Sequence, residues 1–349
     1  MAHFRFSIFF TIVCMFLAAW WGFSGGGIAG LLTALAITAI LAVMEVSLSF
    51  DNAVVNASVL KHWDQFWKTL FLTVGILIAV FGMRLLFPLV IVGVTADMGM
   101  IEVAQLALNN PQEYSAKLMA HHAEIAAFGG MFLMLVFLSF LFDDGKDVHW
   151  FHWLEERLAK LGKVDSVAIF VAMVALLIAV GLLPSTEQFA VLMAGIWGIV
   201  TYVGVSVIGG LLEGEEVEGE DNPEITKAIQ RGGIGGFLYL EVLDASFSFD
   251  GVIGAFAITS DVVIIMLGLA IGAMFVRSMT IYLVDKGTLD AYIYLEHGAH
   301  YAIGALAVIM LISMQFHVPE LVTGLIGVAF IVWAVFASIK YNKLNPAES

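Results

Sequence analysis

Long runs of apolar residues dominate the chain, and short polar stretches separate them. Several runs exceed 18 residues without a Lys, Arg, Asp or Glu, which is the pattern of a membrane-spanning helix. Several also lack an amphipathic period, as lipid and neighbouring helices together allow. The pattern predicts ten spans, at Phe4–Phe23, Ile28–Leu60, Thr69–Val94, His122–Phe142, Val167–Leu183, Phe189–Leu212, Gly236–Thr259, Val262–Val284, His297–Met314 and Leu321–Ile339.

The basic residues agree with this count of spans. Of the 15 Lys and Arg, twelve fall in loops on one predicted side and only Lys117 falls on the other. The side rich in Lys and Arg is normally cytoplasmic. We therefore expect a multi-pass protein of the bacterial cytoplasmic (inner) membrane, with both termini in the cytoplasm. The twelve are Arg5, Lys61, Lys68, Lys146, Arg157, Lys160, Lys163, Lys227, Arg231, Lys286, Lys340 and Lys343, and Arg84 and Arg277 lie within spans.

The first span and three of the loops carry further signals. The first span resembles a signal peptide, but the bulky Trp20 and Trp21 make a poor cleavage site, so we expect a retained helix. Residues 96–121 predict a short amphipathic surface helix with a break at Asn-Asn-Pro. Residues 150–163 predict an interfacial helix with aromatic anchors. The acidic run from Glu213 to Glu224 is typical of a solvated loop, or it concentrates cations.

Composition narrows the function classes. The chain is 61% apolar and 13% charged, against about 25% charged residues in soluble domains, and no polar stretch is long enough for a separate soluble domain. The single cysteine, Cys14, excludes an internal disulfide and a site built from several cysteines. A net charge of −15 argues against nucleic acid as a partner and fits attraction of cations.

Two segments repeat almost word for word within predicted spans, SLSFDNAVV at 47–55 and SFSFDGVIG at 246–254. An offset of 199 residues aligns Glu45 with Asp244 and Asp51 with Asp250. The following spans also correspond, since Gly and Arg are nine residues apart in each. This internal repeat predicts an all-α polytopic membrane protein of two five-helix repeats, residues 1–183 and 184–349, within one membrane domain. Because five is odd, the repeats must be inverted, the usual arrangement of secondary transporters.

Five acidic residues fall in the interior of the predicted spans, away from their ends: Glu45, Asp51, Glu241, Asp244 and Asp250. Each costs roughly 2.5–3.5 kcal/mol to insert unpaired. Arg84 and Arg277 can offset two of them, which leaves an excess of negative charge suited to a divalent cation or protons. A buried ion-pair network that only holds helices together is the structural alternative.

The residues around these acids offer oxygen ligands. Glu45, Ser49, Asn52 and Asn56 share one helical stripe, and a helix break near 47–51 would add backbone carbonyls. Oxygen donors suit Mn²⁺, Mg²⁺ or Ca²⁺. The predicted metal ligands are Glu45, Asp51, Asn52, Glu241, Asp244 and Asp250, with Ser47, Ser49, Ser246, Ser248, Arg84 and Arg277 in support. Two further groups, His121, His122 and Glu124, and Glu296, His297 and His300, are either secondary metal or proton sites or ordinary interfacial residues.

The segments MEVSLSFDNAVVNASVL and LEVLDASFSFDGVIGAFAI resemble the paired acidic motifs of the TerC family, within the LysE-type exporter superfamily, and more narrowly a branch long labelled as a domain of unknown function. The likeness covers about residues 28–314. It implies Mn²⁺ export, with Glu45, Asp51, Asp244 and Asp250 on the motif positions. Two departures put the substrate in question: Gly251 replaces the Asn that follows Asp51, and Glu241 has no acidic counterpart, since Ala42 holds that place.

We therefore expect a secondary transporter that exports a divalent metal cation, Mn²⁺ first among them, and not an enzyme. The metal is the substrate, no permanently bound cofactor is expected, and the bilayer is the other partner. Glycine-rich faces at 25–30 and 232–236 would allow close helix packing, so a homo-oligomer is possible. Two alternatives remain, a non-transporting membrane scaffold of a metal or tellurite stress-response complex, and an intramembrane metal-dependent enzyme. The coupling ion, H⁺ or Na⁺, is not determined by the sequence.

Overall fold

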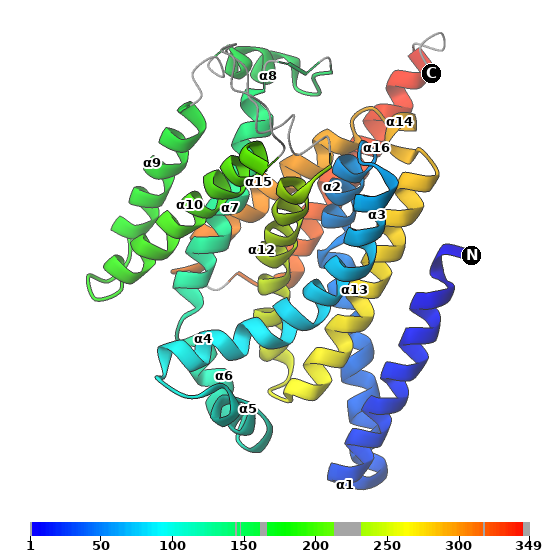
Figure 1. The fold of residues 1–349 in the computed structure, drawn as a ribbon, viewed down its shortest axis with the longest axis vertical. Coiled ribbons are helices and arrows are strands. Elements are labelled where there is room, and N and C mark those ends of the chain that lie inside the picture. The colour runs from blue at the N-terminus through cyan, green and yellow to red at the C-terminus, as the bar shows by residue number, and fades with distance from the viewer. Residues whose placement is uncertain are drawn as a thin grey trace.

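The computed structural model describes residues 2–143, 145–146, 148–160, 166–212, 232–316 and 318–344. All regular elements in these ranges are helices (Figure 1). In chain order they are η1 (Ala2–Phe4), α1 (Arg5–Leu48), α2 (Phe50–Leu60), α3 (Gln65–Leu70), η2 (Phe71–Gly75), η3 (Ile78–Leu86), α4 (Phe87–Thr95), α5 (Met100–Asn109), α6 (Pro111–Met119), α7 (His122–Phe142), α8 (His152–Ala159), α9 (Val167–Gly181), α10 (Gln188–Leu212), α12 (Ile234–Ile258), α13 (Val262–Asp285), α14 (Thr288–Ala291), α15 (Leu295–Ser313) and α16 (Glu320–Leu344).

Seven helices in the described part are long and apolar enough to cross a membrane, with α1 counted once. This confirms the prediction of a helical, multi-pass membrane protein. The ten-span count and its inverted repeat remain predictions. The apolar helix α9 has only 15 residues, fewer than the roughly 20 that a membrane crossing usually takes.

The long helix α1 is a helical hairpin. The backbone leaves helical geometry at Gly26 and Gly27, and Gly27 has φ +60°, a value that L side chains rarely adopt. The two halves of α1 therefore run antiparallel (Figure 1). They pack closely near the turn, because a side chain on Gly22 would lie 2.5 Å from the Cβ of Ala34. Residues 5–25 and 28–48 are thus separate segments, as the apolar pattern predicted.

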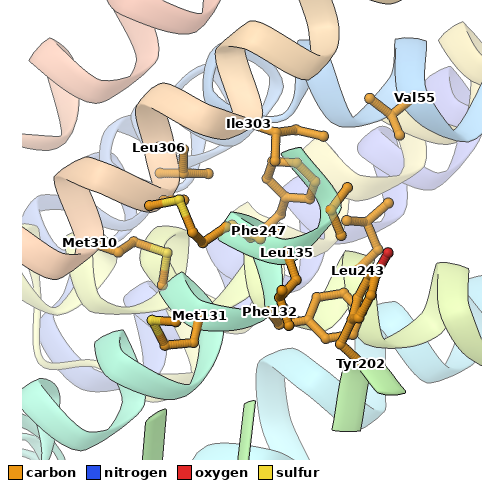
Figure 2. Close-up of a cluster of buried hydrophobic side chains, with 14 of the residues drawn as sticks. Val55, Met131, Phe132, Leu135, Tyr202, Leu243, Phe247, Ile303, Leu306 and Met310 are labelled. Carbon is orange, nitrogen blue, oxygen red and sulfur yellow. The ribbon is translucent and has the colours of Figure 1, made fainter. Parts of the chain in front are cut away.

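The segments that carry the repeated motifs meet at the centre of the bundle. The second half of α1 and α2 contact α12 and α13, and α12 in turn contacts η3 and α7. Helices α7 and α15 pack along each other. Figure 2 shows their shared apolar cluster, to which α2 adds Val55, α10 adds Tyr202 and α12 adds Leu243. These buried side chains hold the motif helices in fixed register.

Matched glycines make matched contacts in the two halves of the chain. A Cβ on Gly75 would meet Glu241 of α12, and a Cβ on Gly268 would meet Leu41 of α1. Likewise Gly129 of α7 faces α15, and Gly304 of α15 faces α7. The sequence pairs these four glycines two by two, so the central helices echo one another in packing as well as in sequence.

The outer helices do not follow the same pairing. The first half of α1 lies on α13, where Ser7 donates to the carbonyl of Met274 at 2.7 Å. Helix α10, its predicted counterpart, packs mainly on α7, with further contacts to α12 and α9. The matched glycine contacts are therefore confined to the central helices, and the five-helix repeat is not confirmed.

The first and last described helical segments come together near residues 285–291, which begin at the end of α13. His3 lies 3.4 Å from Asp285 at the end of α13, and Asn342 donates to the carbonyl of Ala291 in α14 at 2.9 Å. Lys61 reaches Asp290 at the same end, at 3.7 Å. We call this the terminal end of the molecule. Lys117 belongs to α6, whose Tyr114 packs on Phe256 near the opposite end of α12.

The connecting segments partly match their predictions. Residues 96–121 form two short helices, α5 and α6, which meet at Asn110, so the predicted break is present. Helix α8 is shorter than the segment 150–163, and Trp150 and Phe151 pack on Tyr301 and Trp333. The acidic run 213–224 lies outside the described residues, as do Lys163, Lys227 and Arg231.

Candidate functional site

The first motif lies where α1 passes into α2. Ser49 interrupts the helix at φ −106° and ψ 17°, within the predicted region of the break. Glu45, Asn52 and Asn56 are 1%, 6% and 3% exposed. Asp51 is in the first turn of α2, and one of its oxygens accepts a hydrogen bond from the backbone N–H of Asn52 at 3.0 Å. A carboxylate is favoured at this position because helix N-termini carry partial positive charge.

Arg84 pairs with Glu45 at the centre of the bundle. Its Nη2 contacts the Oε1 of Glu45, which also accepts from the hydroxyl of Ser49 at 3.1 Å. The Nη1 of Arg84 donates to the carbonyl of Ala79 at 2.7 Å. Arg84 lies in a π-helical stretch of nine residues, η3. Such wide turns are rare and occur often at functional sites.

A hydrogen bond joins the two motif segments. The side-chain amide of Asn56 in α2 donates to the carboxylate of Asp244 in α12 at 2.8 Å. Asn52 and Arg84 lie near the same carboxylate. Residues 188 positions apart in sequence thus converge, as the alignment of the two motifs predicts for residues of both halves.

These groups surround a small cavity, the Asp244 chamber. Its volume is about 30 Å³, and its polar walls are Ser49, Asn52, Asn56, Arg84, Asp244, Arg277 and Thr280. Arg277 faces this chamber but donates to the backbone carbonyl of Leu72 at 2.6 Å. The formal charges of Glu45, Asp244 and the two arginines sum to zero.

A second cavity, the Asp51 chamber, lies on the other side of Glu45. It measures about 20 Å³, and Glu45, Asp51, Gly251, Thr323 and Gly327 are among its walls. Missing side chains make this space: a Cβ on Gly251 would lie 2.7 Å from Glu45 Oε2, and one on Gly327 would lie 3.3 Å from Asp51 Oδ2. No Lys or Arg of the described chain lines this chamber. Each chamber has room for about one water-sized particle.

The other predicted site residues lie elsewhere. Ser47 is exposed and donates to the carbonyl of Val43 at 2.8 Å, so it points away from both chambers. Ser246 is buried and donates to the carbonyl of Val242 at 2.9 Å, and the buried hydroxyl of Ser248 has no hydrogen-bond partner among the described residues. Glu241 is 8% exposed and faces a third, apolar cavity. Asp250 follows within α12, but its side chain lies outside the described residues.

The five predicted metal ligands whose side chains are described line three different cavities. Among the described side chains, no three of His, Cys, Asp or Glu are placed to hold a metal ion together. The two histidine groups give no such cluster either. His121 contacts Glu124 at 3.2 Å, and His297 bonds the carbonyl of Val148 at 2.9 Å. A cation in either chamber would therefore depend on hydroxyl, amide or backbone oxygens beside the carboxylates.

A larger cavity, the vestibule, opens at the terminal end. It measures about 550 Å³ and includes Ser58 of α2 and Tyr239 of α12 in its wall. Ser58 follows Asn56 by two residues, and Tyr239 precedes Asp244 by five, so the vestibule lies about one helical turn from the Asp244 chamber. Fully buried leucines, including Leu60 and Leu243, lie on the same two helices.

Helix α8 is anchored beside the vestibule by a buried acid. Glu155 is fully buried and accepts hydrogen bonds from Tyr301 at 3.0 Å and from the backbone of Phe151 at 3.2 Å. Lys146 lies 3.7 Å from its other oxygen, an ion pair too long for a hydrogen bond. Burial lowers the pKa of Lys146 below the usual 10.5, and the charge of Glu155 partly opposes that shift.

Three wall residues were missed by reasoning from the sequence. Thr280 of α13 lines the Asp244 chamber, and Thr323 and Gly327 of α16 line the Asp51 chamber. Thr323 is isolated in an apolar run, and glycines are frequent throughout the chain, so no local pattern marks them. Only the packing of α16 against α1 and α2 brings them to the motif.

Comparison with known proteins places the chain in a group without an assigned activity. A family model described as "Protein of unknown function (DUF475)" matches residues 50–345. No curated protein matches the chain, and no solved structure does.

Proposed function

Because the chain belongs to the family of proteins of unknown function DUF475, whose description assigns no activity, we propose a function from its site. The protein is a secondary transporter that exports a divalent metal cation, with Mn²⁺ as the expected substrate, across the bacterial cytoplasmic membrane. The resemblance of its two acidic motifs to those of the TerC family supports the choice of ion and the outward direction.

One observation carries the proposal: the two motifs meet in the interior through the Asn56–Asp244 hydrogen bond. The bond lies beside two small polar chambers that share Glu45 as a neighbour. Two motif segments that only stabilised the helices would have no need of polar cavities. A polar cavity between two halves of a membrane bundle is the usual place for a transported ion.

The charge distribution favours the Asp51 chamber for the cation. The wall of the Asp244 chamber has two arginines and one carboxylate, Asp244. The described wall of the Asp51 chamber has two carboxylates, Glu45 and Asp51, and no Lys or Arg. Asp51, Glu45 and the hydroxyl of Thr323 would supply hard oxygen ligands, and Asp250 is next to Gly251 in this wall. The arginines that line the Asp244 chamber would then change their contacts as the ion passes.

The central helices suggest how access would alternate. We infer two inverted units of three segments each, the first from α1–α2, η3 and α7, the second from α12, α13 and α15. The matched glycine contacts support this pairing. The vestibule leads from the terminal end, which we assign to the cytoplasm because most described Lys and Arg in loops lie there. A movement between the two units would close the vestibule and open the opposite side.

The test is Mn²⁺ export from loaded cells that lack the native protein and express a variant. Asp51→Asn and Asp244→Asn should each slow export at least about tenfold, since each removes a charge without changing shape. Ser47→Ala, at the exposed neighbouring position, should export like the wild type. Normal export by both Asn variants would contradict the proposal and favour the scaffold.

The identity of the ion needs a separate measurement. The purified full chain should gain more thermal stability from Mn²⁺ than from Mg²⁺, Ca²⁺ or Zn²⁺ at equal concentration, because bound ligand stabilises the folded state. Asp51→Asn should reduce that gain. A larger gain with another ion would reassign the substrate and leave the transport proposal in place.

A further inference from the structure

A serine, a carboxylate and an arginine form one connected group in the first motif. The hydroxyl of Ser49 donates to Oε1 of Glu45 at 3.1 Å, and Nη2 of Arg84 contacts the same oxygen. Ser49 follows Glu45 by four residues, a spacing that places both side chains on one face of a helix. All three residues are buried, so these contacts are shielded from water. We call these residues the Glu45 group.

The second motif has the same three kinds of side chain at the matched positions, but they are not joined. They are Asp244, Ser248 and Arg277, which we call the Asp244 group. Ser248 again follows the acid by four residues, yet its buried hydroxyl has no hydrogen-bond partner among the described residues. Arg277 donates from Nε to the backbone carbonyl of Leu72 at 2.6 Å instead of to its matched acid. A buried hydroxyl without a partner costs free energy, so its position needs an explanation.

The backbone around the two groups also differs. The chain leaves α1 and enters α2 at Ser49, whereas α12 continues through Ser248 without a break. Arg84 lies in the π-helical stretch η3, whereas Arg277 lies in α13, which is an α-helix. Matched segments of similar sequence therefore hold two conformations in one structure. Their surroundings, rather than their residues, select between the two.

Arg277 and Asp244 are already placed to meet. Both line the Asp244 chamber, a space of about 30 Å³ that has room for about one water-sized particle. A guanidinium that released the carbonyl of Leu72 would therefore have only a short distance to cross. Ser248 lies one helical turn from Asp244, so its hydroxyl would then donate to that carboxylate as in the first motif. The unpartnered hydroxyl is explained if its partner belongs to another conformation.

We propose that the two groups exchange. The Glu45 group is joined while the vestibule is open, and the Asp244 group is joined when the opposite side is open. In that second state Arg277 pairs with Asp244, Ser248 donates to the same carboxylate, and Arg84 releases Glu45. This inference rests on the movement between two units in the proposed function, and it names the contacts that the movement makes and breaks. One buried ion pair forms as the other separates, so the interior keeps its balance of charge.

The rate at which a cysteine in the vestibule is labelled measures how often the vestibule is open. The reporter is Ser139→Cys in the full chain with Cys14→Ala, since Ser139 is partly exposed and lines the vestibule. The probe is a small, permanently charged methanethiosulfonate. Arg84→Gln removes a contact of the open state alone, so it should slow labelling at least about fivefold. Ser49→Ala should also slow labelling, and Ser47→Ala, at an exposed position, should leave the rate unchanged.

A second substitution tests the contacts of the other state. Adding Arg277→Gln to Arg84→Gln removes the pair that favours closure, so labelling should return to within about twofold of the wild type. Asp244→Asn added to Arg84→Gln should act in the same way. Ser248→Ala should restore part of the rate. It removes a hydroxyl that has no partner in the open state, so the thermal stability of the purified chain should not fall.

Each result decides the proposal. An unchanged rate for Arg84→Gln, or a slowed rate that Arg277→Gln does not restore, would overturn the exchange. If Arg84→Gln does not fold, Ser49→Ala alone and combined with Ser248→Ala give the same comparison. The reporter requires neither metal nor export. Slowed and restored labelling in a protein that exports no Mn²⁺ would retain the exchange and reject the substrate. Normal Mn²⁺ export without restoration would reject the exchange and retain the transporter.

Discussion

The Asp244 carboxylate accepts a short hydrogen bond from Asn56. The amide of Asn56 donates to it at 2.8 Å, and Asn52 and Arg84 also lie near it. Asn56→Asp would place two carboxylates at that distance. We expect a loss of about 3 kcal/mol in the free energy of unfolding unless one acid takes a proton.

Exchanging the amide and the carboxylate between positions 56 and 244 distinguishes the loss of this one interaction from a general loss of stability. In the double variant Asn56→Asp with Asp244→Asn, an amide again faces a carboxylate, so most of the lost stability should return. Thermal unfolding of the purified chains in detergent gives the comparison. A double variant as unstable as Asn56→Asp alone would show that the hydrogen bond is not what holds the motifs together.

At this scale the sequence indicates residue types better than contacts. Glu45, Asp51 and Asp244 stand out because acids are rare in apolar helices. Which chamber each one faces depends on the rotation of its helix and on glycines from other segments, such as Gly251 and Gly327. Arg277 shows the limit, since its match to Arg84 suggests a carboxylate partner, yet it donates to the carbonyl of Leu72.

Among the elements, α8 has the most specific attachment. A short helix of eight residues is marginal alone, so its position depends on the buried Glu155 and on its contacts with Lys146 and Tyr301. Burial lowers the pKa of Lys146. Between that lowered value and 10.5 the unfolded chain holds a proton that the folded chain has released. The free energy of unfolding should therefore rise as the pH increases through this range.

One double variant tests whether Lys146 causes the pH dependence of the free energy of unfolding. Replacing both partners, Lys146→Met with Glu155→Gln, removes the ion pair and leaves Tyr301 an acceptor. The alkaline rise in thermal stability should then be smaller than in the wild type. Parallel pH profiles for the two proteins would mean that Lys146 does not contribute to it.

The elements themselves were largely predictable, because apolar runs and glycine or proline breaks are local signals. The turn at 26–27 and the break at Asn110 follow from such residues. The π-helical stretches η2 and η3 were not predictable. No local pattern in their sequence marks them, and η3 packs against both α12 and α13.

For the whole molecule, the charge asymmetry makes a prediction about orientation. With Cys14 changed to Ala, single cysteines at Lys343 and Gln112 lie at opposite ends of the described structure, and both positions are exposed. A membrane-impermeant maleimide added to intact cells should label the Gln112→Cys protein and spare Lys343→Cys. Inverted vesicles should give the reverse. Labelling of both from the same side would contradict the proposed topology.

The overall architecture shows where reasoning from the sequence ends. Apolar length predicts a helical membrane protein, and the repeated motif predicts that distant segments meet. The placement of the outer helices does not follow, because lipid and protein are equally acceptable neighbours for an apolar face. Helix α10 lies on α7 and the start of α1 lies on α13, and no periodicity in the sequence indicates either pairing.

The start of α1 makes a short polar contact with α13, which lies far along the chain. The hydroxyl groups of Ser7 and Ser278 lie 2.6 Å apart although 271 positions separate them in the chain. During synthesis the N-terminal hairpin must therefore wait in the bilayer until most of the protein has left the ribosome. A nascent chain cut short before α13 would leave Ser7 without that partner in hydrocarbon, a defect that quality-control proteases could recognise before any transport site exists.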